Sequence, residues 1–192
     1  DDQTFHMNDD RDITYQAVVL AGGADMTDIL KLMHKSGIPV EITSGQVSHI
    51  PSNSGLKPLT AGLSFGGYLT PVDEGFHELG ATFDRTAAMA VTDEGHAHNV
   101  GLLPKGMAGL IDASNVSGGF TGRVSQRAST PDRNPIMGHL ADHIYCLGAL
   151  GARGMTFAPL LGDMLAAEIA DMPVSLARDI RHALDPFRFR MR

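Results

Sequence analysis

Residues 143–169, HIYCLGALGARGMTFAPLLGDMLAAEI, decide the fold expected for this chain. The first five residues are mostly apolar and have the length of a strand. Gly148, Gly151 and Gly154 follow, and a helix with one buried face comes next, with Pro159 in its first turn. The apolar residues of that face recur three to four positions apart, at Phe157, Leu160, Leu161, Met164, Leu165 and Ile169. The sequence therefore predicts a strand, a glycine-rich turn and a long helix.

The same order occurs near the start of the chain. Tyr15–Ala21 is a β-branched, nearly continuous apolar run, as expected of a strand buried on both faces, and Gly22-Gly23 ends it. A helix is expected to follow, with Asp25 as its N-cap and Gly37 as its stop. Its buried face would carry Ile29, Leu32 and Met33. Strand, glycine and helix in this order predict an α/β portion.

The middle of the chain has a different sequence pattern. Short β-rich runs are separated by glycine and proline clusters such as residues 51–55, which predicts an antiparallel sheet. The expected strands are Val40–Ile42, Gln46–Ile50, Tyr68–Thr70, His77–Phe83 and Arg123–Arg127. One helix is expected within 86–103, weakened by Gly95, and a last one from Ser175 to just before Pro186.

These patterns predict an α+β fold with a mostly antiparallel sheet, flanking helices and the remnant of a Rossmann-like domain. We expect residues 1–14, which are polar and lack periodicity, to be a disordered or connecting end. Residues 15–37 and 139–192 would form the Rossmann-like remnant, and residues 38–138 the sheet domain.

Bulk properties exclude several classes of protein. The chain has 192 residues, of which 43% are hydrophobic and 19% charged, as in soluble globular proteins. Its net charge of −7 argues against gripping a nucleic acid unaided, although a partner domain could do so. A single cysteine forms no internal disulfide, which suits the cytoplasm. No apolar run approaches the roughly 20 residues that span a bilayer, and no secretory leader is seen. The first residue is Asp1 rather than Met, so a fragment or processed product is expected.

Two features could bind an anion. Backbone N–H groups in the Gly148–Gly154 turn suit a phosphate, a carboxylate or a ring oxygen, although the glycines could equally serve close strand–helix packing. Arg127 and Arg153 carry the planar fork that matches a carboxylate. Without further information, two surface arginines in ordinary ion pairs remain the better interpretation.

No metal site or nucleophile is expected. His96 and His98 diverge on a helix, and His139 and His143 lack the H-E-x-x-H pattern. Cys146 lies within an apolar strand, where a buried structural thiol is expected. No catalytic residue is therefore assigned.

Ordered motifs add a family resemblance. SGQVSHIP at 44–51, GYLTP at 67–71 and LGATF at 79–83 resemble the substrate sheet of the D-amino-acid-oxidase and glycine-oxidase superfamily. RASTPDRNPIMG at 127–138 is similar to its R-x-x-T-x-D-x-x-P-x-x-G segment, and ALGARGMTFAP at 149–159 to its closing flavin turn. Within the superfamily, the sequences of these motifs most resemble the oxidase half of the bifunctional enzymes that make 5-methylaminomethyl-2-thiouridine in tRNA.

The resemblance implies FAD-dependent oxidation of a secondary amine, with loss of the carboxymethyl group of a tRNA wobble uridine as glyoxylate. Arg127, Arg153, Tyr68 and Gln46 would bind substrate. The implied cofactor-binding residues are Ala21, Gly22, Gly23, Gly151, Ala152, Arg153, Gly154, Met155 and Thr156.

Departures from the family leave alternatives open. The dinucleotide fingerprint G-x-G-x-x-G is absent, and Ser44 stands where an arginine is common, so FAD binding by this chain is expected to be weak or absent. The alternatives are an oxidase of a small amine such as glycine or sarcosine, and a non-catalytic module that keeps the fold. The edge of the strand Tyr15–Ala21 is expected to be exposed and to favour self-association.

Overall fold

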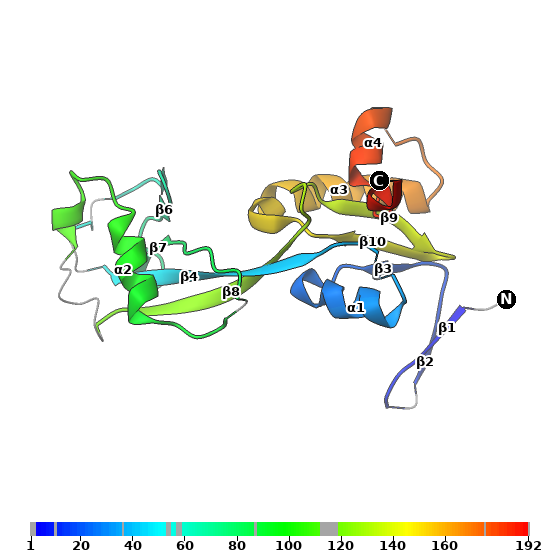
Figure 1. Cartoon of the computed structure of the whole chain (residues 1–192), viewed down its shortest axis with the longest axis horizontal. Helices are drawn as coiled ribbons and strands as arrows, with labels where there is room; N and C mark the ends of the chain where they lie inside the picture. The colour runs from blue at the N-terminus through cyan, green and yellow to red at the C-terminus, as the bar shows by residue number, and fades with distance from the viewer. Residues whose placement is uncertain are drawn as a thin grey trace. The chain divides into compact units, whose positions relative to one another are not determined.

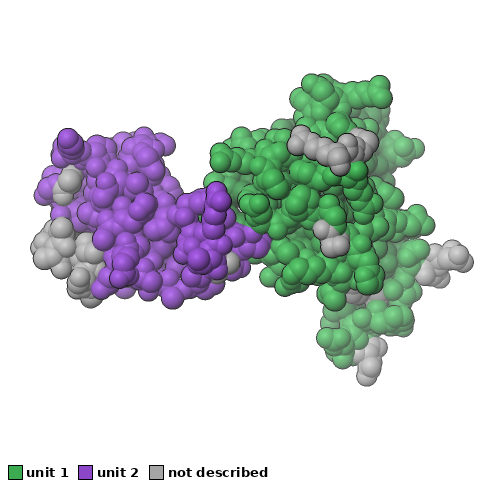
Figure 2. Space-filling view, viewed as in Figure 1, with its two compact units in different colours: residues 1–41, 127–192 green, residues 42–126 purple. Residues whose placement is uncertain are grey.

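The computed structural model describes residues 3–9, 11–35, 37–52, 55–56, 59–86, 88–111, 119–174 and 176–191. The chain divides into two compact units, coloured separately in Figure 2. Unit 1 consists of residues 1–41 and 127–192, and unit 2 of residues 42–126. The expected helix start at Ser175 and part of the 51–55 cluster lie outside the described residues.

Unit 1 is built on a three-stranded sheet with the order β3-β10-β9. β3 (Val18–Leu20) is parallel to β10 (Ile144–Gly148), and β9 (Ile136–Ala141) is antiparallel to it. β9 is not among the strands expected from the sequence, because Pro135 and Gly138 weaken the strand signal.

Helices cover both faces of this sheet (Figure 1). α1 (Met26–Leu32), preceded by the short helix η1 (Gly23–Asp25), buries its apolar side chains against one face. α3 (Gly154–Ile169) and α4 (Arg178–Leu184) pack on the other face. Successive side chains of β9 and β10 point to opposite faces of the sheet, so each face has its own hydrophobic core. The first core contains Met26, Leu30, Ile136, Leu140 and Cys146, and the second Met137, Leu161, Leu165 and Leu184.

Several local expectations for unit 1 are wrong. The segment 1–14, expected to be a disordered or connecting end, is not disordered where it is described, because β1 (Gln3–His6) pairs with β2 (Asp12–Tyr15) in a β-hairpin. β3 is not buried on both faces, since Val19 is 43% exposed. Of the residues expected on the buried face of α1, Leu32 is misplaced, because it is 82% exposed, whereas Met33 packs against the core beside Leu30. Pro159 lies inside α3 rather than in its first turn, because the helix begins at Gly154.

Unit 2 contains the antiparallel sheet that the sequence predicts. Five strands have the order β5-β6-β7-β4-β8, and the pairs β5–β6, β6–β7 and β7–β4 are antiparallel. The strands are β4 (Glu41–Pro51), β5 (Leu63–Ser64), β6 (Tyr68–Leu69), β7 (Phe76–Gly80) and β8 (Thr121–Ser129). The core of this unit includes Ile50, Leu56, Leu69, Leu79 and Phe120, and Leu103 and Ile111 close it. The mixed α+β class is confirmed.

A polar clasp, formed by Gln46, Ser48, Thr92 and Asn99, holds α2 (Asp93–Gly101) on β4. The Gln46 carboxamide donates to Thr92 O (2.9 Å) and accepts from Thr92 N (2.9 Å). The Asn99 amide donates to Gln46 O and to Ser48 Oγ, each at 3.0 Å. Thr92 also caps the helix, because its hydroxyl accepts from Gly95 N at 3.1 Å. The start of α2 is thus fixed by side chains of a buried strand.

Other described elements are the short helices η2 (Ala108–Leu110), η4 (Gly151–Arg153) and η5 (Arg188–Met191). No described helix has the length and apolar character needed to cross a membrane.

The polar clasp leaves no room for a side chain at Gly95. A Cβ there would overlap the Gln46 carboxamide. We therefore expect Gly95→Ala to lower the free energy of unfolding by about 1–3 kcal/mol, measured by denaturant titration. Gly101→Ala is the matched control in the same helix, where a Cβ meets nothing within 4 Å. It should be neutral or stabilising, and an equal loss in both variants would contradict a steric role for the clasp.

Candidate functional site

The parallel pairing of β3 with β10 brings two glycine segments to one edge of the unit 1 sheet. Leu20 pairs with Cys146, so both strands end at the same edge. The segment Ala21–Gly23 follows β3 at this edge, and all three of its residues are exposed. Gly23 has a φ of +58°. The chain leaves β10 at Gly148, where a Cβ would lie 2.9 Å from Met26 Cε of α1. The two segments predicted to bind the cofactor therefore emerge side by side.

The turn between β10 and α3 is a short helix, η4, that runs into α3. Gly151 has a φ of +57°, which a residue with a side chain rarely adopts. Arg153 occupies the N-cap position of α3 without a side-chain capping bond, and the first turn carries no acidic residue. Ala152, Met155 and Thr156 are exposed, Met155 by 95%. A helix N-terminus of this kind attracts an anion or an electron-rich ring oxygen.

The end of β8 lies against this turn. Ser129 forms an antiparallel bridge with Leu150, and a Cβ on Gly151 would lie 3.8 Å from Ser129 Cβ. Arg127 precedes Ser129 by two positions on the same strand and is half-buried. Within the described ranges, no hydrogen bond or ion pair engages its guanidinium. The strand that carries Arg127 therefore ends against the turn that precedes α3.

The Arg153 guanidinium is held by two contacts. Its Nη2 donates to Arg133 O at 3.1 Å, and its carbon lies 4.8 Å from the centre of the Phe157 ring, in a cation–π arrangement. Arg133 itself has a φ of +61°, which is unfavourable for any residue except glycine. The position of Arg153 therefore depends on the loop that contains Arg133.

That loop, residues 130–134, is organised by Asp132 and Thr130. Asp132 Oδ1 accepts from Thr130 Oγ1 (2.8 Å) and from Asn134 N (3.1 Å). Arg188 of η5 forms a bidentate pair with the same carboxylate, from Nε to Oδ2 at 2.8 Å and from Nη2 to Oδ1 at 2.9 Å. Neither Arg188 nor Asp132 is among the site residues expected from the sequence, although Asp132 is the acidic position of the R-x-x-T-x-D motif.

Electrostatics keep this carboxylate charged. The Arg188 guanidinium, which donates to Asp132, holds the pKa of that carboxyl well below its usual range, and donation by Asn134 N and Thr130 adds to the effect against a smaller opposing contribution from burial. The Arg188 side chain is almost completely buried, so its charge needs the carboxylate of Asp132, which is itself 36% exposed.

The two remaining predicted substrate residues belong to unit 2, whereas Arg127 and Arg153 belong to unit 1. Gln46 is buried, and its carboxamide is engaged at both ends by the polar clasp. The Tyr68 ring lies over Gly80, where a Cβ would come within 3.4 Å of the phenol. The geometry thus gives Gln46 a structural role, and substrate contact by either residue stays a prediction.

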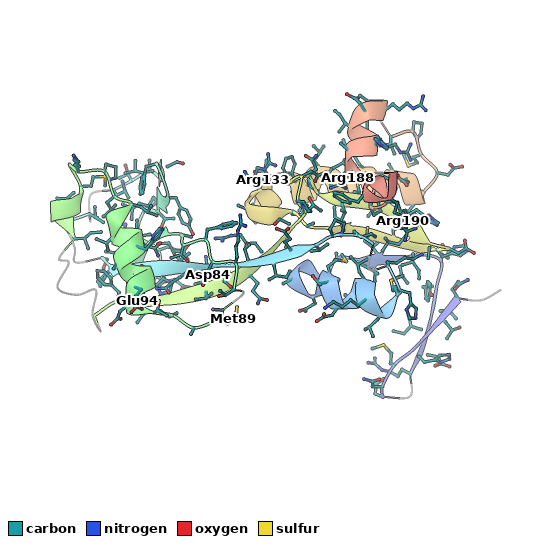
Figure 3. All side chains as sticks on the ribbon, viewed as in Figure 1. Asp84, Met89, Glu94, Arg133, Arg188 and Arg190 are labelled. Carbon is teal, nitrogen blue, oxygen red and sulfur yellow. The ribbon has the colours of Figure 1, made fainter. Side chains whose placement is uncertain are left out.

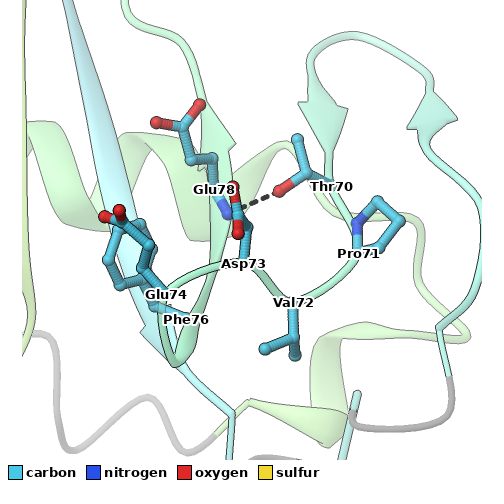
Figure 4. A pocket seen from close by; sticks show the side chains of 7 residues that line it. All are labelled: Thr70, Pro71, Val72, Asp73, Glu74, Phe76 and Glu78. Carbon is cyan, nitrogen blue, oxygen red and sulfur yellow. Dashed lines mark hydrogen bonds between the residues drawn. The ribbon is translucent and has the colours of Figure 1, made fainter.

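Two surface hollows lie away from these residues. One is lined by Thr70, Pro71, Val72, Asp73, Glu74, Phe76 and Glu78 (Figure 4). Its three carboxylates would repel an acidic ligand, and Glu78 is paired with Arg123 at 3.2 Å. The other, in unit 1, surrounds the ion pair of Arg181 with Glu168 (3.1 Å). Neither hollow includes a residue predicted to bind substrate or cofactor.

Two buried titratable side chains, those of Cys146 and His96, have structural contacts. Cys146 is fully buried, as expected, and burial raises the pKa of its thiol to about 12. His96 accepts or donates a 2.7 Å hydrogen bond with Ser48 Oγ, and burial lowers its pKa. In the part of the chain that the structure describes, no three His, Cys, Asp or Glu side chains are placed to hold a metal ion.

Comparison with known proteins gives consistent matches. The model of the FAD-dependent oxidoreductase family (DAO) matches residues 3–168. The tRNA 5-methylaminomethyl-2-thiouridine biosynthesis bifunctional protein MnmC of Caulobacter vibrioides is 38% identical over 174 residues, which are 90% of this chain and 27% of that protein. The chain thus spans about a quarter of the length of this relative.

Solved structures share the fold at lower identity. L-proline dehydrogenase from P. horikoshii has a TM-score of 0.71 at 22% identity, covering 98% of this chain and 50% of its own. Glycine oxidase from Bacillus cereus has a TM-score of 0.66 at 21% identity, covering 86% and 46%.

The ion pair of Asp132 with Arg188 makes a pH-dependent prediction. A carboxyl group whose pKa is lowered by folding stabilises the folded chain fully above its unfolded pKa of about 3.9, and this contribution is lost as the pH falls below that value. We expect Asp132→Asn to lower the free energy of unfolding by about 1–2 kcal/mol at pH 7. The difference from the wild type should shrink below about pH 4.

Denaturant titrations between pH 3 and pH 7 measure this difference. Asp163→Asn, which changes an exposed carboxylate of α3, is the matched control and should cost little at any pH. A gap for Asp132→Asn that stays constant down to pH 3 would show that the charge of Asp132 contributes nothing.

Proposed function

The chain belongs to the FAD-dependent oxidoreductase family, and on that basis we propose that it forms part of an enzyme that oxidises a secondary amine. The substrate we propose is the carboxymethylaminomethyl group of a wobble uridine in tRNA. The observation that carries the proposal is that the end of β8, the strand of Arg127, bridges to the turn before α3 at Ser129 and Leu150, while the loop that follows bonds Arg153 through the Arg133 carbonyl. Identity of 38% with the tRNA-modifying relative supports the choice of substrate.

The proposed cofactor contacts follow from exposed backbone. Gly151, Ala152, Arg153, Gly154, Met155 and Thr156 would face the flavin ring, where the helix N-terminus stabilises negative charge. Ala21, Gly22 and Gly23 would pass near the dinucleotide half, at the same edge of the sheet. FAD, when bound, accepts the hydride from the carbon next to the substrate nitrogen. We expect binding by these 192 residues alone to be weak, because they contain no G-x-G-x-x-G fingerprint.

The protein supplies orientation and charge. Arg127 would hold the substrate carboxylate with its planar fork, and Arg153 would assist from the helix start. Fixing the carboxylate places the adjacent CH₂ group toward the turn. Loss of a hydride and the amine proton leaves an imine, which water splits into glyoxylate and the free aminomethyl group. No side chain is proposed as a general acid or base.

The reacting group is an N-substituted glycine, which sarcosine shares. A small-amine oxidase is therefore the alternative enzyme, and a non-catalytic module is the alternative of another class. The proposed setting is the cytoplasm, where tRNA would be the partner.

An assay of the purified protein, as its gene encodes it, separates these functions. Bound flavin is recognised by yellow absorbance, and turnover by glyoxylate release from sarcosine and from tRNA that carries the carboxymethylaminomethyl group. We expect tRNA to be the better substrate by kcat/KM. Preference for sarcosine would favour the small-amine oxidase, and absence of bound flavin and turnover would favour the non-catalytic module.

Arg127→Ala tests the carboxylate contact. We expect it to raise KM by about 10- to 100-fold, because a charge-assisted bidentate pair is lost. Arg123→Ala is the matched control, since Arg123 lies on the same strand but pairs with Glu78. Unchanged KM in Arg127→Ala, or an equal effect in both variants, would rule out the proposed role.

Self-association through the edge of β3 is a further part of the proposal. Val18 N donates to His143 O, so parallel pairing directs the N–H and C=O of Val19 away from β10. The side chain of Val19 is also exposed.

An unpaired strand edge favours pairing with another chain. Sedimentation should therefore show a mass that increases with protein concentration. Val19→Lys, which places a charge at the edge, should reduce this increase, and a wild-type monomer at all concentrations would contradict self-association.

A further inference from the structure

We infer that Arg188 is a positioning residue for the Arg153 guanidinium and acts on it through Asp132 and the backbone of Arg133. The inference deepens the proposed function, on which its consequence for substrate binding rests. Its geometry lies wholly within unit 1, where Figure 3 labels both Arg133 and Arg188.

The first step is the grip of Arg188 on the 130–134 loop. Its side chain is only 6% exposed. Besides the bidentate pair with Asp132, Nη2 donates to Asn134 O at 2.9 Å, and Nη1 donates to Asp185 O at 3.0 Å. Its carbon also lies 4.3 Å from the centre of the Phe189 ring. One buried guanidinium therefore ties the loop to the C-terminal segment at several points.

The second step is the effect of this grip on the shape of the loop. Arg133 adopts left-handed backbone angles, which a non-glycine residue keeps only when its surroundings compensate. Compensation comes from Asp132, whose carboxylate accepts from Asn134 N, and from the turn bond between Arg133 N and Thr130 O (3.0 Å). Because Arg188 fixes that carboxylate, it also fixes the direction of the Arg133 carbonyl.

The third step connects the carbonyl to the candidate site. Arg133 O accepts from Arg153 Nη2, and this is the hydrogen bond found for the Arg153 side chain among the described residues. The exposed guanidinium otherwise rests on the Phe157 ring, a contact that permits rotation. Loss of the carbonyl position should therefore free the Arg153 side chain without unfolding the helix that carries it.

A purely structural ion pair would behave differently. It would lower the stability of unit 1 when broken but leave Arg153 as ordered as before. The order of the Arg153 side chain is therefore the measurement that separates the two roles.

The experiment records ¹⁵N relaxation of the arginine Nε–Hε groups in the purified chain, with the Arg153 signal assigned by its loss in Arg153→Lys. We expect an ordered Arg153 in the wild type and an order parameter below about 0.6 in Arg188→Ala, typical of a flexible group. Arg188→Lys keeps the charge but not the fork, and should give an intermediate value. Asp132→Asn is the second variant, used if Arg188→Ala does not fold. It keeps an acceptor for Asn134 N but removes the charge that pairs with Arg188, and it should also lower the Arg153 order parameter.

The matched control is Arg181→Ala. It breaks the ion pair with Glu168 in the same unit without touching the 130–134 loop. Its Arg153 signal should match the wild type. Unchanged Arg153 order in Arg188→Ala and in Asp132→Asn would overturn the inference, as would an equal loss of order in Arg181→Ala.

A second readout concerns the substrate. In the purified holoenzyme, Arg188→Ala should raise KM for sarcosine about tenfold with little change in kcat, as expected when one ground-state contact is weakened. An unchanged KM beside a mobile Arg153 would refute the role of Arg153 in substrate binding, whereas the positioning by Arg188 would stand on the relaxation data.

Discussion

Parallel pairing between β3 and β10 is the interaction on which the arrangement of unit 1 depends. Parallel strands end at one edge of a sheet, so the glycine segments that follow them, at 21–23 and 151–156, emerge together. Packing reinforces this arrangement, because Met26 of α1 lies against Gly148, where an added Cβ would come within 2.9 Å of the Met26 Cε. A ligand at this edge would meet glycine backbone, a helix N-terminus and the Arg153 side chain, which together suit an electron-rich group.

Near that edge, one buried guanidinium pairs with a partly exposed carboxylate. The Arg188 guanidinium would be costly to bury alone, and its hydrogen bonds to Asp132 offset that cost. The loop that they hold carries a strained residue, Arg133, whose carbonyl reaches Arg153. Strain of this kind is maintained only where the surrounding structure compensates for it, and such places are often functional.

Unit 2 shows how a sequence motif can serve a scaffold. Gln46 and Ser48 belong to the SGQVSHIP stretch that resembles a substrate sheet, yet both side chains hold α2 on β4. Buried polar groups need partners, and here the partners are the backbone of Thr92 and the amide of Asn99. The motif therefore marks the fold of the family, while the role of Gln46 in binding substrate remains a prediction.

The sequence by itself determined the α+β class, the antiparallel sheet, the strand–turn–helix around 143–169 and the family, because periodicity and turn residues are local signals. It also predicted that Cys146 is buried. Sequence did not determine the hairpin at 3–15, the strand β9 or the exposure of Leu32 on α1. Those depend on contacts between distant residues, as does the pair of Asp132 with Arg188, which are 56 positions apart. Only the tertiary structure decides such pairs, because the sequence contains many acidic and basic residues and does not indicate which of them the fold brings together.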